Sequence, residues 1–299
     1  MKYIIDTDPG IDDAIAIMLG MKNDLDVIGF TLASGNIPVK KSEKNLGIIQ
    51  DFLETNIKMY RGTFENNCDH DTAEFAHGKD GLGYAVFPDI YKRKFERQSA
   101  EDIIYKMAKK YKNELTLICF GPLTNLANSI KKHPDLNKYL KHILIMGVSY
   151  ADEASEPYLE FNINVDVDAA KLVFDTYFDD VKVVTHEVGV QSFIEKDYID
   201  NLRNSEDLVS RFVGEIGQKY MEFSKEHYNT IGLGTPDPTT VATLIDENIV
   251  SFVPCKIDVI DKGDKKGQTI VDVVDKSNIQ ISNDFNLERF RKVFKNTFK

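Results

Sequence analysis

Four aspartates near the start of the chain are the group of side chains best placed to do chemistry. Asp6 and Asp8 end an apolar run, and Asp12 and Asp13 follow a Pro-Gly pair. Residues 2–19 predict a strand, a tight turn and a helix. Because strand side chains alternate, the first pair shares one face, while the second pair lies in the first helical turn. We expect the four carboxylates to converge on one corner of the fold.

Such a corner needs neutralisation. Neighbouring carboxylates in a partly dry site repel one another, so they either take up protons or bind a cation. The ligands nearby are oxygens, with no local His or Cys, and this favours Ca²⁺ or Mg²⁺ over zinc or copper. A simpler interpretation is that Asp12 and Asp13 only cap the helix and complement its positive N-terminus. Capping leaves Asp6 and Asp8 unexplained.

The elements that must position these residues predict an α/β fold. Strands are expected at residues 25–32, 57–60, 114–120, 142–146 and 181–185, with helices at 38–53, 99–112, 165–174, 208–226 and 239–245. This alternation predicts an open, mostly parallel central sheet with helices on both faces. Residues 250–260 and 269–281 predict a small antiparallel C-terminal addition, and residues 287–298 a closing helix. With no break in composition, residues 1–299 are expected to form a single domain.

Polar residues gather after the predicted strand ends, where open α/β sheets bind ligands. Asn36 follows the second strand, and irregular stretches are expected at residues 61–97, 148–164 and 227–238. Long irregular segments in a compact domain are often functional. The simpler interpretation makes His77 a surface residue in a plain turn and Asp237 a helix N-cap.

Composition restricts the function classes. The 299 residues are 42% hydrophobic and carry a net charge of −11, which allows a large core and argues against nucleic acid or anionic membrane as a partner. Cys68, Cys119 and Cys255 form neither a disulfide framework nor a metal pattern. The chain has no apolar leader and no apolar run of membrane-spanning length, so we expect a soluble cytoplasmic protein.

One alternative chemistry is phosphoryl transfer. Asp6-Thr-Asp8 offers a nucleophile with a second carboxylate two residues on, as in haloacid-dehalogenase-type phosphatases. Such an enzyme would continue with Gly-Thr or Gly-Val and supply a Ser or Thr and a Lys for the phosphate. This chain adds Asp12 and Asp13 instead, and extra carboxylates repel a phosphate dianion but suit a neutral polyol.

The stretch Asp-Thr-Asp-Pro-Gly-Ile-Asp-Asp-Ala at residues 6–14 closely resembles the N-terminal signature of the inosine-uridine-preferring nucleoside hydrolases. Later stretches resemble that family's blocks in its order: Ser-Gly-Asn at 34–36, His-Gly at 77–78, Gly-Pro-Leu-Thr-Asn at 121–125, Ile-Met-Gly at 145–147, Glu-Phe-Asn at 160–162, Val-Asp at 165–166, Ala-Ala at 169–170 and Asp-Pro at 237–238. The resemblance implies hydrolysis of the N-glycosidic bond of ribonucleosides to ribose and free base, as in purine and pyrimidine salvage.

The resemblance also implies the members of the site. A tightly bound Ca²⁺ would be held by Asp8, Asp13, Asp237 and the main-chain carbonyl of Thr124. Asp8 would be the general base on a calcium-bound water that attacks the anomeric carbon, and Asp6 would support the loop. Substrate contacts are implied for Asp12, Asn36, Met146, Glu160, Phe161 and Asn162. General physics agrees, because a metal lowers the pKa of bound water and negative charge stabilises a ribosyl cation.

Two positions depart from the family's pattern. Many members carry a His before the second metal aspartate, where it is thought to protonate the leaving base, and this chain has Pro236. Members also commonly carry an Asn at the position of Ala154, touching the 5′-hydroxyl. We therefore expect leaving-group help from His77, His227 or Tyr228.

The chain has no Trp, so a base would stack on Phe or Tyr. The two departures keep open a non-catalytic or altered-specificity protein that binds ribose and calcium. The preferred nucleobase is not predicted. Because members are typically dimers or tetramers, a homodimer or homotetramer is expected.

Overall fold

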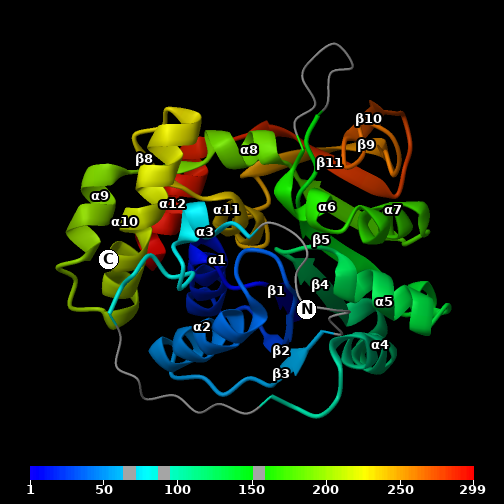
Figure 1. Cartoon of the computed structure of the whole chain (residues 1–299), viewed down its shortest axis with the longest axis horizontal. Coiled ribbons are helices and arrows are strands. Elements are labelled where there is room, and N and C mark those ends of the chain that lie inside the picture. Colours follow the sequence, from blue (N-terminus) through cyan, green and yellow to red (C-terminus); the bar gives the residue numbers. More distant parts are fainter. Residues whose placement is uncertain (63–71, 87–94, 151–158) are drawn as a thin grey trace.

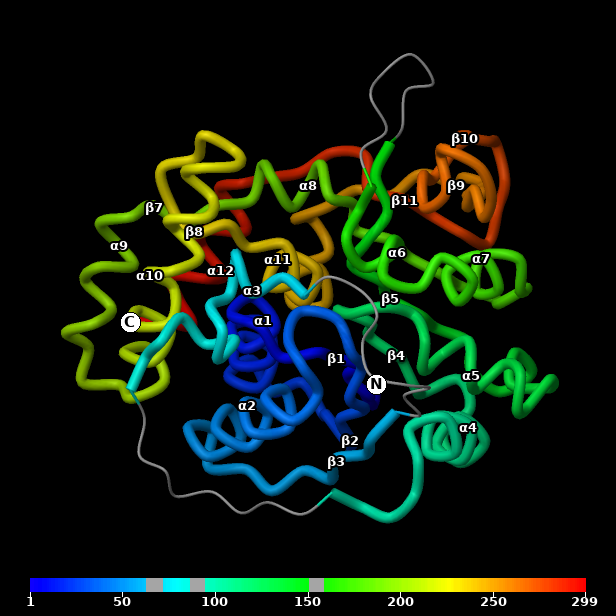
Figure 2. Tube along the Cα trace, viewed as in Figure 1, coloured from blue at the N-terminus to red at the C-terminus, as the bar shows by residue number. Residues whose placement is uncertain are grey.

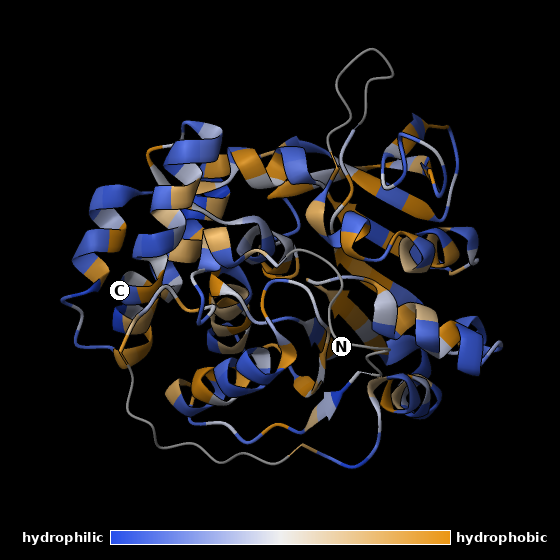
Figure 3. Cartoon of the chain, viewed as in Figure 1, coloured by the Kyte–Doolittle hydropathy of each residue, from blue (hydrophilic) through white to orange (hydrophobic). Residues whose placement is uncertain are grey.

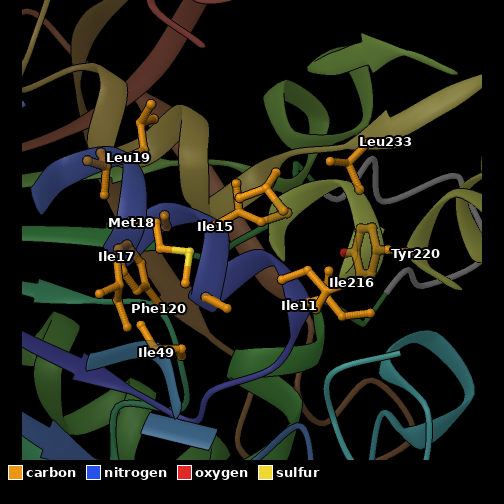
Figure 4. Close-up of a cluster of buried hydrophobic side chains, with 14 of the residues drawn as sticks. Ile11, Ile15, Ile17, Met18, Leu19, Ile49, Phe120, Ile216, Tyr220 and Leu233 are labelled. Carbon is orange, nitrogen blue, oxygen red and sulfur yellow. The ribbon is translucent and has the colours of Figure 1, made fainter. Parts of the chain in front are cut away.

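The computed structural model describes residues 1–62, 72–86, 95–150 and 159–299. The chain begins as predicted with a strand, β1 (Lys2–Thr7), a turn, and a helix, α1 (Ile11–Lys22). Residues 11–20 of α1 are all buried, which explains why this helix is apolar on most sides. Figure 4 shows Ile11, Ile15 and Met18 of this helix within a cluster of buried hydrophobic side chains.

Nine strands form one twisted sheet in the order β10-β9-β11-β6-β5-β4-β1-β2-β3 (Figure 1). Strand β1 is an interior strand, and it pairs in parallel with both of its neighbours, β4 and β2. The predicted open, mostly parallel sheet is confirmed. The other strands are β2 (Val27–Leu32), β3 (Met59–Arg61), β4 (Leu115–Cys119), β5 (His142–Met146), β6 (Asp180–Val184), β9 (Val250–Val259), β10 (Thr269–Val273) and β11 (Ile279–Phe285).

The strand order changes direction beside β1. From β1 the chain builds β2 and β3 on one side, and later places β4, β5 and β6 on the other. Ligands of open α/β sheets bind at such a switch point, outside the carboxyl ends of the strands. Asp8 follows β1 at this point, so the topology itself brings the aspartate motif to the crevice.

Helices cover both faces of the sheet, as predicted. Ile4 packs in one apolar cluster and Ile5 in the other, because neighbouring residues of β1 point to opposite faces. Figure 3 shows most helices with one apolar and one polar side. One cluster includes α2 (Val39–Phe52), α10 (Leu208–Tyr228), α11 (Pro236–Ala242) and α12 (Leu287–Thr297), and the other includes α4 (Ala100–Tyr111), α5 (Thr124–Lys132) and α7 (Val167–Asp175).

The C-terminal strands extend the main sheet. Strand β9 is antiparallel to β10 and β11, as predicted, but β11 pairs in parallel with β6. The antiparallel addition is therefore continuous with the central sheet. No helix in the described ranges is both long enough and apolar enough to cross a bilayer.

Three stretches expected to be irregular contain regular structure. Helix α10 continues to Tyr228, where Asn229 ends it in the left-handed conformation with φ of 51°. Strand β8 (Gly232–Gly234) then pairs with β7 (Phe193–Glu195). Four short α-helices were also absent from the prediction, because they offer too few turns for periodicity to reveal: α3 (Glu74–His77), α6 (Phe161–Val165), α8 (His186–Gln191) and α9 (Lys196–Leu202).

Helices α3 and α10 lie side by side although they are far apart in the chain (Figure 2). This contact joins the two segments in which we expected catalytic His and Tyr residues. It forms one wall of the cavity described next.

Candidate active site

A cavity of about 400 Å³ opens at the carboxyl ends of the central strands. It is bounded by residues that follow β1, β2, β5 and β6 and by α3, α10 and α11. Asp8 and Asp13 lie behind its surface and are fully buried, and Thr124 does not line it either. The other predicted site residues all line it: Asp12, Asn36, His77, Met146, Glu160, Phe161, Asn162, His227, Tyr228 and Asp237.

Three buried carboxylates meet at the inner end of this cavity. Ligand oxygens of Asp12, Asp13 and Asp237 lie within 4.8 Å of one another. Asp12 and Asp13 come from the first turn of α1, and Asp237 comes from the first turn of α11. The interpretation of Asp237 as an N-cap is wrong, because Thr235 occupies that position. The group differs from the implied metal ligands in containing Asp12 rather than Asp8.

Asp13 is the most strongly held member of the group. Thr7 Oγ1 donates to its Oδ1 at 2.6 Å, while Gly10 N–H and Asn36 Nδ2 donate to its Oδ2 at 3.0 and 2.9 Å. The bond from Gly10 is an N-terminal helix cap, so the capping interpretation is correct for one of Asp13's contacts. These hydrogen bonds fix the orientation of the Asp13 carboxylate without any ligand.

Asp8 is enclosed by main chain. Asn36 N–H donates to Oδ2 at 2.6 Å, whereas Oδ1 has no hydrogen-bond partner among the described residues. A Cβ at Gly35 would lie 2.1 Å from Oδ2, and one at Gly121 would lie 2.4 Å from Oδ1. Both positions must be glycine for the carboxylate to fit, and one of its oxygens is left for another partner.

Asp6 and Thr124 do not line the cavity. Thr31 Oγ1 and Asn125 Nδ2 donate to Asp6 Oδ1 at 2.5 and 2.7 Å, which ties β1 to β2 and α5. Thr124 begins α5, and its Oγ1 donates to Asp166 Oδ2 at 2.6 Å. Of the four carboxylates expected to converge, Asp12 and Asp13 meet, joined by Asp237, while Asp6 Oδ1 accepts from Thr31 of β2 and Asn125 of α5.

Burial raises the pKa of the aspartates of the motif and of Asp237. The pKa of Asp12 and Asp13 rises to about 6, and that of Asp6 to about 7, with desolvation as the main cause. The pKa of Asp8 and Asp237 rises well above the ordinary value, first through desolvation and then through repulsion by the neighbouring aspartates. The charged cluster is thus unfavourable without a counter-charge.

A hard cation fits this donor set. The oxygens of Asp12, Asp13 and Asp237 are close enough to share one ion, and the buried Asp8 Oδ1 has no other described partner. All these donors are carboxylate oxygens, which suit Ca²⁺ or Mg²⁺. The chain therefore has a site that could hold a metal ion.

A second wall of the cavity is polar and comes from α6 and β5. Glu160 is the N-cap of α6, and its carboxylate accepts the N–H groups of Asn162 and Ile163 at 3.1 and 2.9 Å. Asn162 Nδ2 donates to the carbonyl of Phe120 at 2.6 Å. Burial raises the pKa of Glu160 to about 7. Met146, at the end of β5, completes this wall.

His77 is buried and packs against the aspartate loop. It is 3% exposed, so the interpretation as a surface residue is wrong. Its Nδ1 accepts the N–H of Ile11 at 3.1 Å, and its ring stacks on Tyr220 at 5.3 Å between centroids. Burial lowers its pKa to about 4, which keeps the ring neutral near pH 7. Tyr220 Oη also donates to Asp12 Oδ2 at 3.2 Å.

The outer part of the cavity is aromatic. His227 lies on the exposed end of α10. Its ring packs on those of Phe223 and Phe75 of α3, with 4.5 and 5.9 Å between the ring centroids. Phe75 is 57% exposed at this mouth. Tyr228 meets Phe223 edge to face at 5.4 Å. Such surfaces suit a flat, partly apolar ligand.

Sequence reasoning missed several residues that line the cavity: Phe75, His186, Tyr220 and Phe223. His186 lies two residues past the end of β6, so the strand-end signal that selected Asn36 also pointed to it. Tyr220 and Phe223 lie inside the predicted helix at 208–226, where helical spacing gives no sign that they face a cavity rather than a core. Of the two positions that depart from the family's pattern, Pro236 lines the cavity and Ala154 lies outside the described residues.

Comparison with known proteins agrees with the geometry. The family model of the inosine-uridine preferring nucleoside hydrolases matches residues 3–292. Probable uridine nucleosidase 2 of Arabidopsis thaliana is 32% identical over 279 residues, covering 90% of this chain and 85% of that protein. The pyrimidine-specific ribonucleoside hydrolase RihA of Salmonella enteritidis is 30% identical over 282 residues, covering 91% of this chain and 88% of that protein.

Solved structures extend the likeness to the whole fold. The purine-preferring ribonucleoside hydrolase from Gardnerella vaginalis superposes with a TM-score of 0.89 at 27% identity, covering 100% of this chain and 98% of that chain. The match includes the switch point at which the buried carboxylates and the cavity lie. On this evidence the chain is a ribonucleoside hydrolase and belongs to the inosine-uridine preferring nucleoside hydrolase family.

Proposed function

We propose that this enzyme hydrolyses the N-glycosidic bond of ribonucleosides by water attack at the anomeric carbon, with Asp8 as general base. The observation that carries the proposal is the buried carboxylate group of Asp12, Asp13 and Asp237 at the inner end of a cavity whose mouth is aromatic. A polyol fits the charged end, and a flat base fits the mouth.

Ca²⁺ is the proposed resident ion, with Asp8, Asp13, Asp237 and the carbonyl of Thr124 as its ligands. Asp12 lies close enough to join them. When bound, the ion would neutralise the carboxylates and lower the pKa of a water molecule in the site. The carboxylates keep negative charge near the sugar, which stabilises a developing ribosyl cation.

Asp8 is suited to take the proton of the attacking water. Its Oδ2 is fixed by Asn36 N–H, while Oδ1 has no hydrogen-bond partner in the described parts of the chain. A carboxylate held in one orientation by its backbone surroundings transfers a proton without first reorienting. Because Gly35 and Gly121 have no side chains, they leave room for the Asp8 carboxylate in this small space.

The sugar and base are proposed to lie across the two walls. Asp12, Asn36, Glu160 and Asn162 would hold the hydroxyl groups, with Met146 and Phe161 packing beside the ribose. On the base side we propose contacts from His77, His227 and Tyr228. Phe75 and Phe223 supply the stacking surface that a chain without Trp needs.

The base preference is left to experiment, since the relatives named above include uridine, pyrimidine-specific and purine-preferring enzymes. The test is a nucleoside panel assayed for reducing sugar and free base with Ca²⁺ present, including nicotinamide riboside and 5′-modified nucleosides. We expect turnover of at least one ribonucleoside, lost on chelation and restored by Ca²⁺. Thermal shifts with nucleosides but no turnover would indicate a non-catalytic binder. Phosphate release from a phosphomonoester would support the phosphatase alternative.

We also propose that the enzyme is a cytoplasmic homodimer or homotetramer. In the described part of the chain, Cys119 and Cys255 are free, buried thiols, which suits a reducing compartment. Sedimentation or light scattering of the purified protein tests the assembly, and a monomer at micromolar concentration would contradict it.

A further inference from the structure

A leaving nucleobase departs with the electron pair of the broken bond, so it needs a proton or a strong hydrogen-bond donor. The carboxylates at the inner end of the cavity are poor candidates, because they serve the sugar side of the proposed reaction. The candidates are the imidazoles and phenols that line the outer part: His77, His186, His227, Tyr220 and Tyr228.

The contacts of His77 disfavour a cationic acid. Its Nδ1 already accepts the N–H of Ile11 at 3.1 Å, so a proton on Nδ1 would break that bond. A Cβ at Gly10 would lie 2.8 Å from the same nitrogen, which shows how closely the ring packs on the loop. His77 is therefore fixed as a neutral ring whose proton sits on Nε2.

His227 and Tyr220 are engaged elsewhere. His227 Nδ1 lies 3.2 Å from the Phe223 carbonyl, within its own helix, and the residue is exposed at the rim. Tyr220 Oη donates to Asp12 Oδ2 at 3.2 Å, which directs it to the carboxylate group. With these contacts, neither His227 nor Tyr220 is placed to give a proton to a base in the middle of the cavity.

His186 has a more suitable place. It is the first residue of α8, two residues past the carboxyl end of β6, and it is half-buried in the cavity wall. Its ring packs against that of Tyr228 of α10, with 5.6 Å between the ring centroids. Burial lowers the pKa of His186, and the nearby charge of Glu187 opposes that lowering. Glu187 Oε1 accepts from Ser149 Oγ at 2.5 Å and from Tyr150 N–H at 2.8 Å.

Helix α8 also touches the carboxylate end of the site. A Cβ at Gly189, one turn beyond His186, would lie 2.9 Å from Pro236 Cβ and 3.7 Å from the Met146 methyl group. Pro236 precedes Asp237, one of the three grouped carboxylates. The wall that carries His186 is thus continuous with the wall beside the ribose, so a base attached to that ribose would extend toward His186 and Tyr228.

We propose that His186, with Tyr228 packed against it, is the proton donor to the leaving base. As the C1′–N bond breaks, its electron pair passes to the base nitrogen, and the His186 imidazolium gives that base a proton. The attacking water forms the new C1′–O bond and loses its proton to Asp8. Exchange with solvent then returns the proton from Asp8 to His186, so the net reaction is nucleoside plus water to ribose plus base.

This inference rests on the proposed function, and a choice of substrate separates the two. Nucleosides need a proton on the departing base, whereas p-nitrophenyl riboside loses a stable phenolate and does not. We expect His186→Gln to lower kcat on the best nucleoside by about 10² or more while leaving p-nitrophenyl riboside turnover nearly unchanged. His142→Gln, the same change at the start of β5, where His142 pairs with Asp180, is the matched control.

The outcomes are distinct. If the wild-type enzyme releases neither base nor p-nitrophenol, the proposed function fails. If it cleaves both substrates and His186→Gln slows both equally, or neither, the assignment of His186 is overturned. Turnover of p-nitrophenyl riboside by the variant shows that it is folded. Tyr228→Phe is expected to give a smaller loss in the same selective pattern.

Discussion

At the scale of single residues, the site depends on side chains with two tasks. Asp13 caps α1 through Gly10 and belongs to the carboxylate group, and Glu160 caps α6 while lining the cavity. Tyr220 stacks on His77 and donates to Asp12. Because these bonds fix the functional groups in place, the site is organised before substrate arrives.

Asp8→Asn tests the general base. The amide has the same shape and its oxygen can still accept from Asn36 N–H, but it cannot take a proton from water. We expect kcat on the best nucleoside to fall about 10²-fold to 10⁴-fold at saturating Ca²⁺. Asp24→Asn, on the exposed residue after α1, is the control and should keep full activity. An Asp8→Asn enzyme with normal kcat would remove Asp8 from the mechanism.

At the scale of elements, two strand-to-helix connections enclose one carboxylate. The turn after β2 brings Gly35 against Asp8, and the turn after β4 brings Gly121 to its other side. Parallel neighbours β4, β1 and β2 end at the same edge of the sheet, so three separate turns meet there. The geometry around Asp8 is a property of this junction and not of the aspartate motif alone.

Gly35→Ala tests this junction. The added Cβ would lie 2.1 Å from Asp8 Oδ2, so the carboxylate must move. We expect activity to fall about as far as in Asp8→Asn, while circular dichroism still reports a folded protein. Gly47→Ala in α2 is the matched control, because nothing lies within 4 Å of its Cβ. That control should stabilise the protein by about 1 kcal/mol or leave it unchanged. Full activity of Gly35→Ala would contradict the described packing.

At the scale of the whole molecule, folding buries carboxyl groups at a cost that depends on pH. The folded-state pKa of Asp12 and Asp13 is about 6, and that of Asp6 and Glu160 is about 7, all above the ordinary values. The folded state therefore binds more protons than the unfolded state between about pH 4 and pH 7. Stability of the metal-free protein must fall as the pH rises through that window.

Calcium should reverse this trend. In chelator, we expect the Tm to be higher near pH 5 than at pH 8, since protons neutralise the buried group only at the lower pH. Added Ca²⁺ should raise the Tm more at pH 8, where no protons compete for the oxygens. Differential scanning calorimetry across this range measures both effects. A calcium shift that is larger at pH 5, or absent at both values, would argue against a calcium site at these carboxylates.

Several features followed from the sequence alone. The strand, turn and helix of residues 2–19, the alternation that gives a mostly parallel sheet, and the oxygen-only character of the acidic corner are local patterns of spacing and residue type. Periodicity recognises such patterns because strands and helices repeat every 2.0 and 3.6 residues. Short elements such as α3 and α8 offer too few repeats, and they were missed.

Only the tertiary structure decided which side chains share a space. It brought Asp12 to Asp13 and Asp237, turned Asp6 toward Asn125, and packed His186 of α8 against Tyr228 of α10. These partners are far apart in the chain, and no local repeat encodes their distance. The physical reason is that a short stretch of sequence contains the side-chain types and their spacing, whereas strand order and packing of the whole core determine which segments lie close together.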